Sequence, residues 1–163
     1  MRNKTIVLMA SGLVALLAAC DNKATTPGKP SFYQSLASSS AQIDSGMARG
    51  MISAYRRNNG LDPLVLDPTL QAAAAEEVRS LAANDRPASA DAVKARLAQN
   101  GMLRTEVNVS AGYHTLAEAF SGWRDSPQHN RVMLSPSARR MGIATAFAPG
   151  SKYKVYWVMI VAP

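Results

Sequence analysis

The chain contains a single cysteine, Cys20, and this residue constrains the fold more than any other feature. One thiol cannot form a disulfide within the chain, and a zinc cluster built from several cysteines is excluded for the same reason. Stability must therefore come from a hydrophobic core. The 163 residues suit one folded domain, and a content of 47% hydrophobic and 18% charged residues is typical of a globular protein.

The segment that ends at Cys20 resembles a bacterial lipoprotein signal peptide. Arg2 and Lys4 precede an uncharged run, residues 6–19, which is shorter than the roughly 20 residues that a membrane-spanning helix needs. The run ends in Leu-Ala-Ala-Cys, which resembles the lipobox, where the cysteine is lipidated and becomes the first residue. We therefore predict a signal peptide at 1–19 and a membrane anchor through lipid on Cys20. The alternative is an ordinary secretory signal that leaves a free thiol.

The charge balance favours anionic partners. The chain has 18 basic and 11 acidic residues, a net charge of +7, and removal of Arg2 and Lys4 with the signal peptide leaves +5. Such a surface suits phospholipid headgroups or envelope glycans. The predicted export places the protein in the bacterial cell envelope, facing the periplasm or the exterior, and excludes nucleic acid as a partner. We interpret the pairs Arg56-Arg57 and Arg139-Arg140 as solvated.

Two segments follow the predicted signal peptide. Residues 20–40 are rich in Ser, Thr, Pro and Gly, a composition that predicts a lipid-anchored flexible tether. Phe32, Tyr33 and Leu36 interrupt this tether and are apolar enough to dock on the domain. Residues 41–163 are predicted to form the folded domain.

The apolar spacing in the domain predicts helices first and strands later. Helices are expected at 41–58, from Pro68 after an Asp67 cap, at 89–100 before Gly101, after the capping box Thr115 to Glu118, and from Pro127 after a Ser126 cap. Strands are expected at 105–109, 141–147 and 152–161, the last two as an antiparallel hairpin. This order predicts an α+β layer fold.

Several motifs, in order and spacing, resemble one known family. They are Arg56 to Leu61 with Pro63-Leu64, Arg96 with Gly101, Val107 to Gly112, Trp123 followed by Ser126-Pro127-Gln128-His129, Met141 to Ala144, and Tyr156-Trp157. The segment from about 48 to 161 resembles the disulfide-free bacterial branch of the CAP superfamily (cysteine-rich secretory, antigen 5 and pathogenesis-related 1 proteins). The resemblance implies an α-β-α sandwich around a small antiparallel sheet that is flanked by helices. It also implies a cleft, which in many members holds two histidines and two glutamates. Some members bind a divalent metal there, and others bind sterols or fatty acids.

The chain departs from the family pattern at most cleft positions. The candidate cleft residues are His129, Glu106, Asn108 and Ser126, and of the family's four only His129 is kept. Val107 replaces the glutamate that precedes Asn108, and Glu106 points to the opposite face of an extended segment. Ser126 replaces the second glutamate. We therefore expect no metal site of the family kind and no cofactor, and no catalytic residue can be named.

The histidines leave three functions open. His129 is expected at the third position of a helix, where the positive end of the dipole favours a neutral imidazole. Its spacing from Ser126 is that of a helix cap and not of a nucleophile with its base. The first hypothesis is a noncatalytic module that binds a lipid, glycan or protein. The second is a hydrolase that uses His129 with Glu106 or His114, and the third is a structural envelope protein.

Overall fold

The computed structural model describes residues 29–86 and 88–163. The predicted signal peptide, Cys20 and the first part of the predicted tether, residues 20–28, lie outside the described residues. Within the described ranges, no helix is both long and apolar enough to span a membrane. The elements are η1 (Ser31–Tyr33), α1 (Ser45–Asn58), β1 (Val65–Leu66), α2 (Pro68–Ala83), α3 (Ala90–Gln99), β2 (Glu106–Ala111), α4 (Leu116–Asp125), α5 (Pro127–Met133), β3 (Arg140–Phe147) and β4 (Val155–Ala162).

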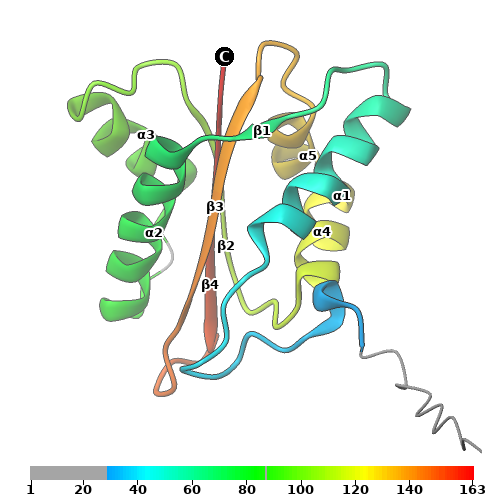
Figure 1. Ribbon diagram of the computed structural model, residues 1–163. Helices are drawn as coiled ribbons and strands as arrows, with labels where there is room; N and C mark the ends of the chain where they lie inside the picture. The colour runs from blue at the N-terminus through cyan, green and yellow to red at the C-terminus, as the bar shows by residue number, and fades with distance from the viewer. Residues whose placement is uncertain (1–28, 87) are drawn as a thin grey trace, which may run out of the picture.

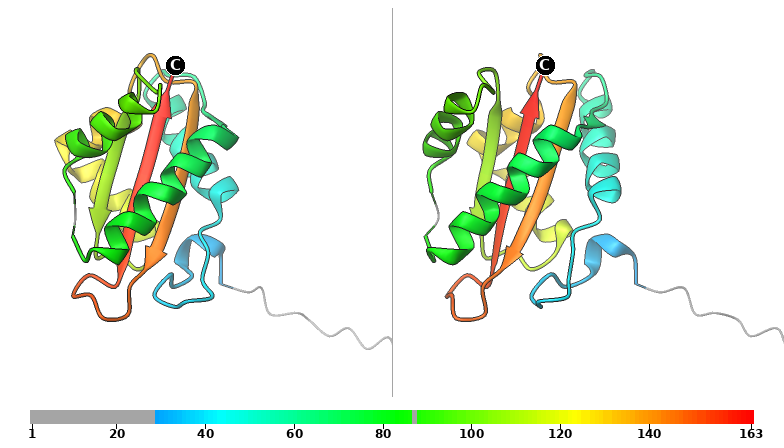
Figure 2. Two further views of the ribbon diagram at one scale, coloured as in Figure 1. Left: turned by 90° about the vertical axis from the view of Figure 1, so that its left-hand side faces the viewer. Right: turned by 60° about the vertical axis from the view of Figure 1, so that its left-hand side comes forward.

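The sheet has the strand order β1-β3-β4-β2 and confirms the predicted α+β sandwich. β3 and β4 form the predicted antiparallel hairpin, and β2 pairs antiparallel with β4. The two-residue strand β1 pairs parallel with β3, so the sheet is mixed, a detail that a strand this short does not signal in the sequence. α2 and α3 cover one face of the sheet, and α1, α4 and α5 cover the other (Figures 1 and 2).

Three side-chain caps are formed, and two of them, Asp67 and Thr115, are predicted from the sequence. Asp67 caps α2 by accepting a hydrogen bond from the Leu70 amide at 2.9 Å, and Ser89 caps α3 in the same way. Thr115 caps α4 through the Glu118 amide at 3.2 Å. Because each side chain satisfies an amide that has no partner within the helix, these residues fix where the helices begin.

Ser126 is the exception among the predicted caps. It precedes α5, but its side chain makes no capping hydrogen bond, so the prediction of a serine side-chain cap is wrong. Pro127 starts this helix instead, because its fixed φ is already helical and it has no amide hydrogen to satisfy.

The core consists of one cluster on each face of the sheet. On the α1, α4 and α5 side, Trp123 and Trp157 meet edge to face with centroids 5.8 Å apart. On the α2 and α3 side, Val and Leu side chains surround the buried Tyr156. Every residue of β4 is buried, as expected for a central strand that is covered on both sides. On β3, Gly142 lies directly under the Leu70 backbone of α2, where a Cβ atom would clash.

The described part of the predicted tether packs against the domain. Leu36 is buried, and its amide donates to the His114 carbonyl at 2.7 Å. Phe32 packs on the core, whereas Tyr33 is exposed. The folded body therefore includes residues that precede position 41.

Arg56 corrects the interpretation of its arginine pair as solvated. Its side chain is completely buried, and its guanidinium donates to the carbonyls of Asp62, Met133, Ser135 and Ala138 at 2.8 to 3.0 Å. This cation ties the end of α1 to the loop between α5 and β3. The neighbouring Arg57 is exposed, as expected.

Candidate functional site

A groove of about 620 Å³ runs along β2, between the start of α3 and α5. It brings together three of the four predicted cleft residues, namely Glu106, Asn108 and His129. The fourth, Ser126, precedes α5 and is not part of the lining. The polar rim also includes Asp91, Lys94 and Arg131. These three residues were not identified from the sequence, because helical periodicity marks them only as exposed.

Alternation along β2 directs its side chains. Glu106 and Asn108 point to the α4 and α5 side, where Glu106 accepts a hydrogen bond from the Ser135 hydroxyl at 3.0 Å. Val107 points to the opposite side and is buried in the cluster under α2 and α3. The predicted change of face between Glu106 and the family's glutamate position is therefore confirmed.

His129 places an unpaired ring nitrogen inside the groove wall. Burial lowers the pKa of its imidazole below the usual value of 6.5, and a hydrogen bond with the backbone of Val109 partly offsets this decrease. Nδ1 is buried and has no partner among the described residues. In a neutral imidazole one nitrogen carries a proton and the other a lone pair, so Nδ1 offers either a donor or an acceptor.

Asn108 presents an acceptor at the same groove. Its side chain is fully buried, and Nδ2 donates to the His129 carbonyl at 3.0 Å. This bond fixes the orientation of the amide, because a flipped amide would place its oxygen against a carbonyl oxygen. Oδ1 then remains buried without a partner in the described part of the chain. Nearly all buried polar atoms in folded proteins are paired, so two unpaired atoms at one groove point to a missing partner.

The donor set does not fit a metal of the family kind. In the described ranges 29–86 and 88–163, no three His, Cys, Asp or Glu side chains are grouped closely enough to hold an ion. His114 is exposed in the loop before α4, where its amide donates to Glu118, and it does not line the groove. It therefore does not replace the family's first histidine.

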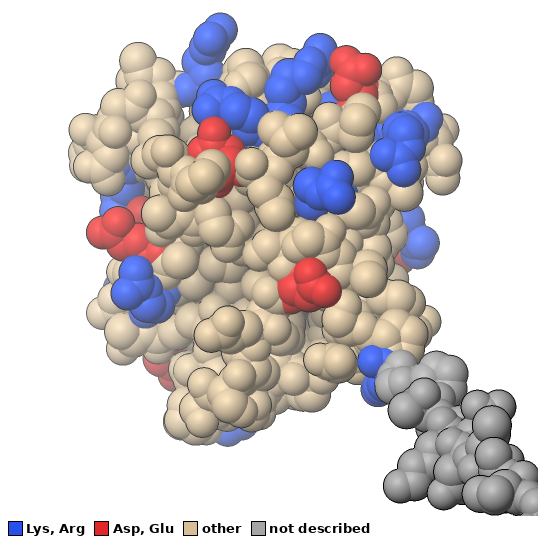
Figure 3. All heavy atoms as spheres, in the orientation of Figure 1, with Lys and Arg blue, Asp and Glu red and all other residues tan. Residues whose placement is uncertain are grey.

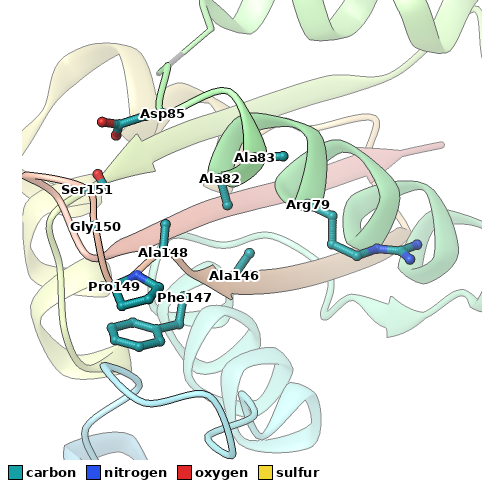
Figure 4. Close-up of a pocket in the computed structure, with 10 residues that line it drawn as sticks. All are labelled: Arg79, Ala82, Ala83, Asp85, Ala146, Phe147, Ala148, Pro149, Gly150 and Ser151. Atoms are coloured by element: carbon teal, nitrogen blue, oxygen red, sulfur yellow. The ribbon is translucent and has the colours of Figure 1, made fainter.

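A second hollow, of about 480 Å³, lies between the end of α2 and the β3-β4 hairpin (Figure 4). Its walls are mostly Ala side chains and Phe147. The Asp85 carboxylate accepts a hydrogen bond from the Tyr156 hydroxyl, which also lies 2.9 Å from the hydroxyl of Ser151. Because these polar groups satisfy one another, the hollow lacks the orphaned atoms that distinguish the groove along β2.

Comparisons with known proteins agree with this architecture. Residues 50–161 match the model of the cysteine-rich secretory protein family, named CAP. No curated protein sequence matches the chain. An outer surface protein of Borrelia burgdorferi is similar in structure, with a TM-score of 0.62 and 18% identity over 75% of this chain and 96% of that protein.

Two further solved structures are similar to this chain over less than half of their own length. An extracellular protein of Bacillus anthracis that contains an SCP domain gives a TM-score of 0.58, and a cysteine-rich secretory protein of Staphylococcus aureus gives 0.57, both at 18% identity over 72% of this chain. The chain spans 40% and 37% of their lengths. At this identity, the likeness concerns the fold.

Proposed function

The chain belongs to the cysteine-rich secretory protein (CAP) family, and from this premise we propose that it is a noncatalytic, lipid-anchored protein of the bacterial envelope that binds a ligand in the groove along β2. The observation that carries this proposal is the pair of buried polar atoms without a hydrogen-bond partner, His129 Nδ1 and Asn108 Oδ1. A buried polar atom without a partner costs about 1 to 3 kcal/mol. Because both atoms are closed off from solvent, a ligand or a water beneath it reaches them when side chains of the groove wall move, and the hydrogen bonds then formed remove that cost.

The chemistry of the two atoms narrows the ligand class. Asn108 Oδ1 accepts a hydrogen bond, and His129 Nδ1 accepts or donates one, so the ligand must offer groups such as hydroxyls or amides, which can do both. Lys94 and Asp91 on the rim suit a polar ligand that carries charge or many hydroxyls. Among the lipid, glycan and protein ligands that the sequence leaves open, these features favour a glycan or a peptide-bearing envelope component over a hydrocarbon chain.

The arrangement of side chains favours binding over hydrolysis. A hydrolase would need His129 paired with an acid or a nucleophile, but Glu106 is hydrogen-bonded to Ser135 and His114 lies outside the groove. A purely structural role would not explain why two buried polar atoms at the groove have no hydrogen-bond partner among the described residues.

Lipid anchoring is the second part of the proposal. It rests on the lipobox-like sequence that ends at Cys20. In cells, the Cys20→Ser variant should move from the membrane fraction to the soluble fraction after osmotic lysis, or stay as an unprocessed precursor. Mature protein that remains in the membrane fraction despite the substitution would disprove lipidation at this residue.

The groove is tested on protein purified in detergent from its own envelope. Native mass spectrometry should detect a small-molecule adduct on the wild type and on Ser126→Ala, which lies outside the lining. The adduct should be lost from His129→Ala. An adduct of equal occupancy on all three proteins would place the ligand elsewhere, and catalytic turnover of the released ligand by the wild type would favour the hydrolase.

A further inference from the structure

One end of the sheet carries exposed aliphatic side chains. Val65 and Leu66 of β1 are 57% and 38% exposed, and Leu103, in the loop before β2, is 78% exposed. They are three of the four large hydrophobic side chains exposed in the described residues, and the fourth, Tyr33, belongs to η1. We define the distal face as these three residues together with Arg57, Arg104 and Arg139.

The strand register brings the strand and loop residues of this face to the same end, and Arg57 lies in the last turn of α1, a helix that contacts β1. Val65 pairs with Arg140 at the start of β3, and Arg140 pairs with Ala162 at the end of β4. β2 begins beside the same end of β4, so the preceding Leu103 lies there too, and both Leu103 and Arg140 line one shallow hollow. This end lies away from η1, where the described chain enters the domain (Figure 1).

The charges at this end have an excess of arginine. Arg139 pairs with Asp62 at 3.3 Å, and Arg140 pairs with Asp67 at 2.8 Å. No carboxylate among the described residues forms an ion pair with the remaining Arg57 and Arg104. Basic side chains gather over the upper part of the surface in Figure 3, whereas the lower part of that view shows few charges.

We propose that the distal face docks on an anionic phospholipid bilayer. Exposed aliphatic side chains on loops and strand edges insert among the headgroups, and the surrounding guanidinium groups bind the phosphates. A single exposed aliphatic side chain is ordinary in water, but three of the four exposed large hydrophobic side chains in the described residues lie at one end of the sheet. Cations without carboxylate partners favour a negative surface, so the two features together fit an anionic bilayer better than either does alone. The face lies at the end of the domain away from η1, so the described residues before α1 do not cover it (Figure 1). This inference depends neither on a ligand in the groove nor on a lipid at Cys20.

The test measures sedimentation with vesicles, using residues 20–163 with Cys20→Ser so that no lipid anchor contributes. Vesicles of phosphatidylglycerol and phosphatidylcholine should bind the protein in a salt-sensitive manner, and vesicles of phosphatidylcholine alone should bind it far more weakly. Arg104→Glu should lower the partition coefficient by at least about tenfold, and Leu103→Ser by roughly tenfold. Both positions are exposed, so the variants should retain the wild-type fluorescence of the buried tryptophans.

The matched control is Lys152→Glu, which makes the same charge change in the β3-β4 hairpin at the opposite end. It should bind as the wild type does. An equal loss for Lys152→Glu and Arg104→Glu would overturn the proposal, because net charge alone would then explain binding. Unchanged binding by Arg104→Glu and Leu103→Ser would also overturn it and would leave the face as a candidate for an acidic protein.

Discussion

Replacing Arg56 should be among the most damaging single changes in this domain. Its side chain is fully buried, yet no carboxylate hydrogen-bonds to it, and the guanidinium instead donates to four backbone carbonyls. Burial lowers the pKa of Arg56, which reflects the cost of keeping a cation away from water. The hydrogen bonds to the four carbonyls must offset that cost. These carbonyls lie in the loop after α1, at the last residue of α5 and in the loop between α5 and β3.

The expected loss of stability follows from the carbonyl groups that lose their hydrogen-bond donor when Arg56 is replaced. In Arg56→Met, the four carbonyls stay buried while their donor disappears, because backbone acceptors cannot be removed together with the side chain. Each buried carbonyl left without its donor costs about 1 to 3 kcal/mol, and part of that cost is offset because a cation no longer has to be kept away from water. With four such carbonyls, the net loss should still be several kcal/mol. Domains of this size have about 5 to 15 kcal/mol of total stability, so the variant should lose a large share and melt roughly 10 °C lower or more. Arg56→Lys should recover only part of the loss, since an ammonium cannot reach four acceptors in the same fork geometry.

Urea unfolding followed by tryptophan fluorescence measures this loss directly, because Trp123 and Trp157 are both fully buried. The control is Arg57→Met, an exposed neighbour that should change stability by less than about 0.5 kcal/mol. If Arg56→Met unfolded within about 1 kcal/mol of the wild type, the guanidinium would not be holding the loops together.

Three further changes test other parts of the structure. Gly142→Ala should destabilise the domain by about 1 to 3 kcal/mol in urea unfolding, since a Cβ atom would strike the backbone of α2, whereas Gly50→Ala in open space on α1 should be neutral or stabilising. Leu36→Ala should cost about 2 to 4 kcal/mol if the N-terminal segment is part of the core, and no loss would show that it is only a tether. Because the folded-state pKa of His129 is depressed, its contribution to stability is complete above pH 6.5 and decreases as the pH falls below 6.5. His129→Asn should flatten the decrease in stability as the pH falls below 6.5, and an unchanged slope would mean that the imidazole is not buried.

Local rules predicted most of the elements correctly. The predicted caps Asp67 and Thr115 mark two helix starts, and Gly101 ends α3 with a positive φ of 83° as the sequence predicts. The unbroken apolar run of β4 predicted a central strand. These features depend on neighbours in the sequence, so the sequence alone is enough to identify them.

Long-range contacts were missed for a physical reason. The burial of Arg56 depends on carbonyls that lie up to 82 residues away, and an adjacent arginine gives no sign of it. The pairing of β1 requires β3 to lie beside it, which two residues cannot indicate. In the groove, the resemblance to the CAP family identified Asn108 and His129 as cleft residues. Only the three-dimensional arrangement shows that Asn108 Oδ1 and His129 Nδ1 are buried without a hydrogen-bond partner.

The most direct test of the proposed function is a high-resolution crystal structure of the protein purified from its own envelope without a refolding step. The account predicts ordered density in the groove, with a hydroxyl or amide donor, or a water bridging to one, within hydrogen-bond distance of His129 Nδ1 and Asn108 Oδ1. Density that shows only disordered solvent, with both atoms paired to groups of the chain itself, would contradict the claim that this groove holds a ligand.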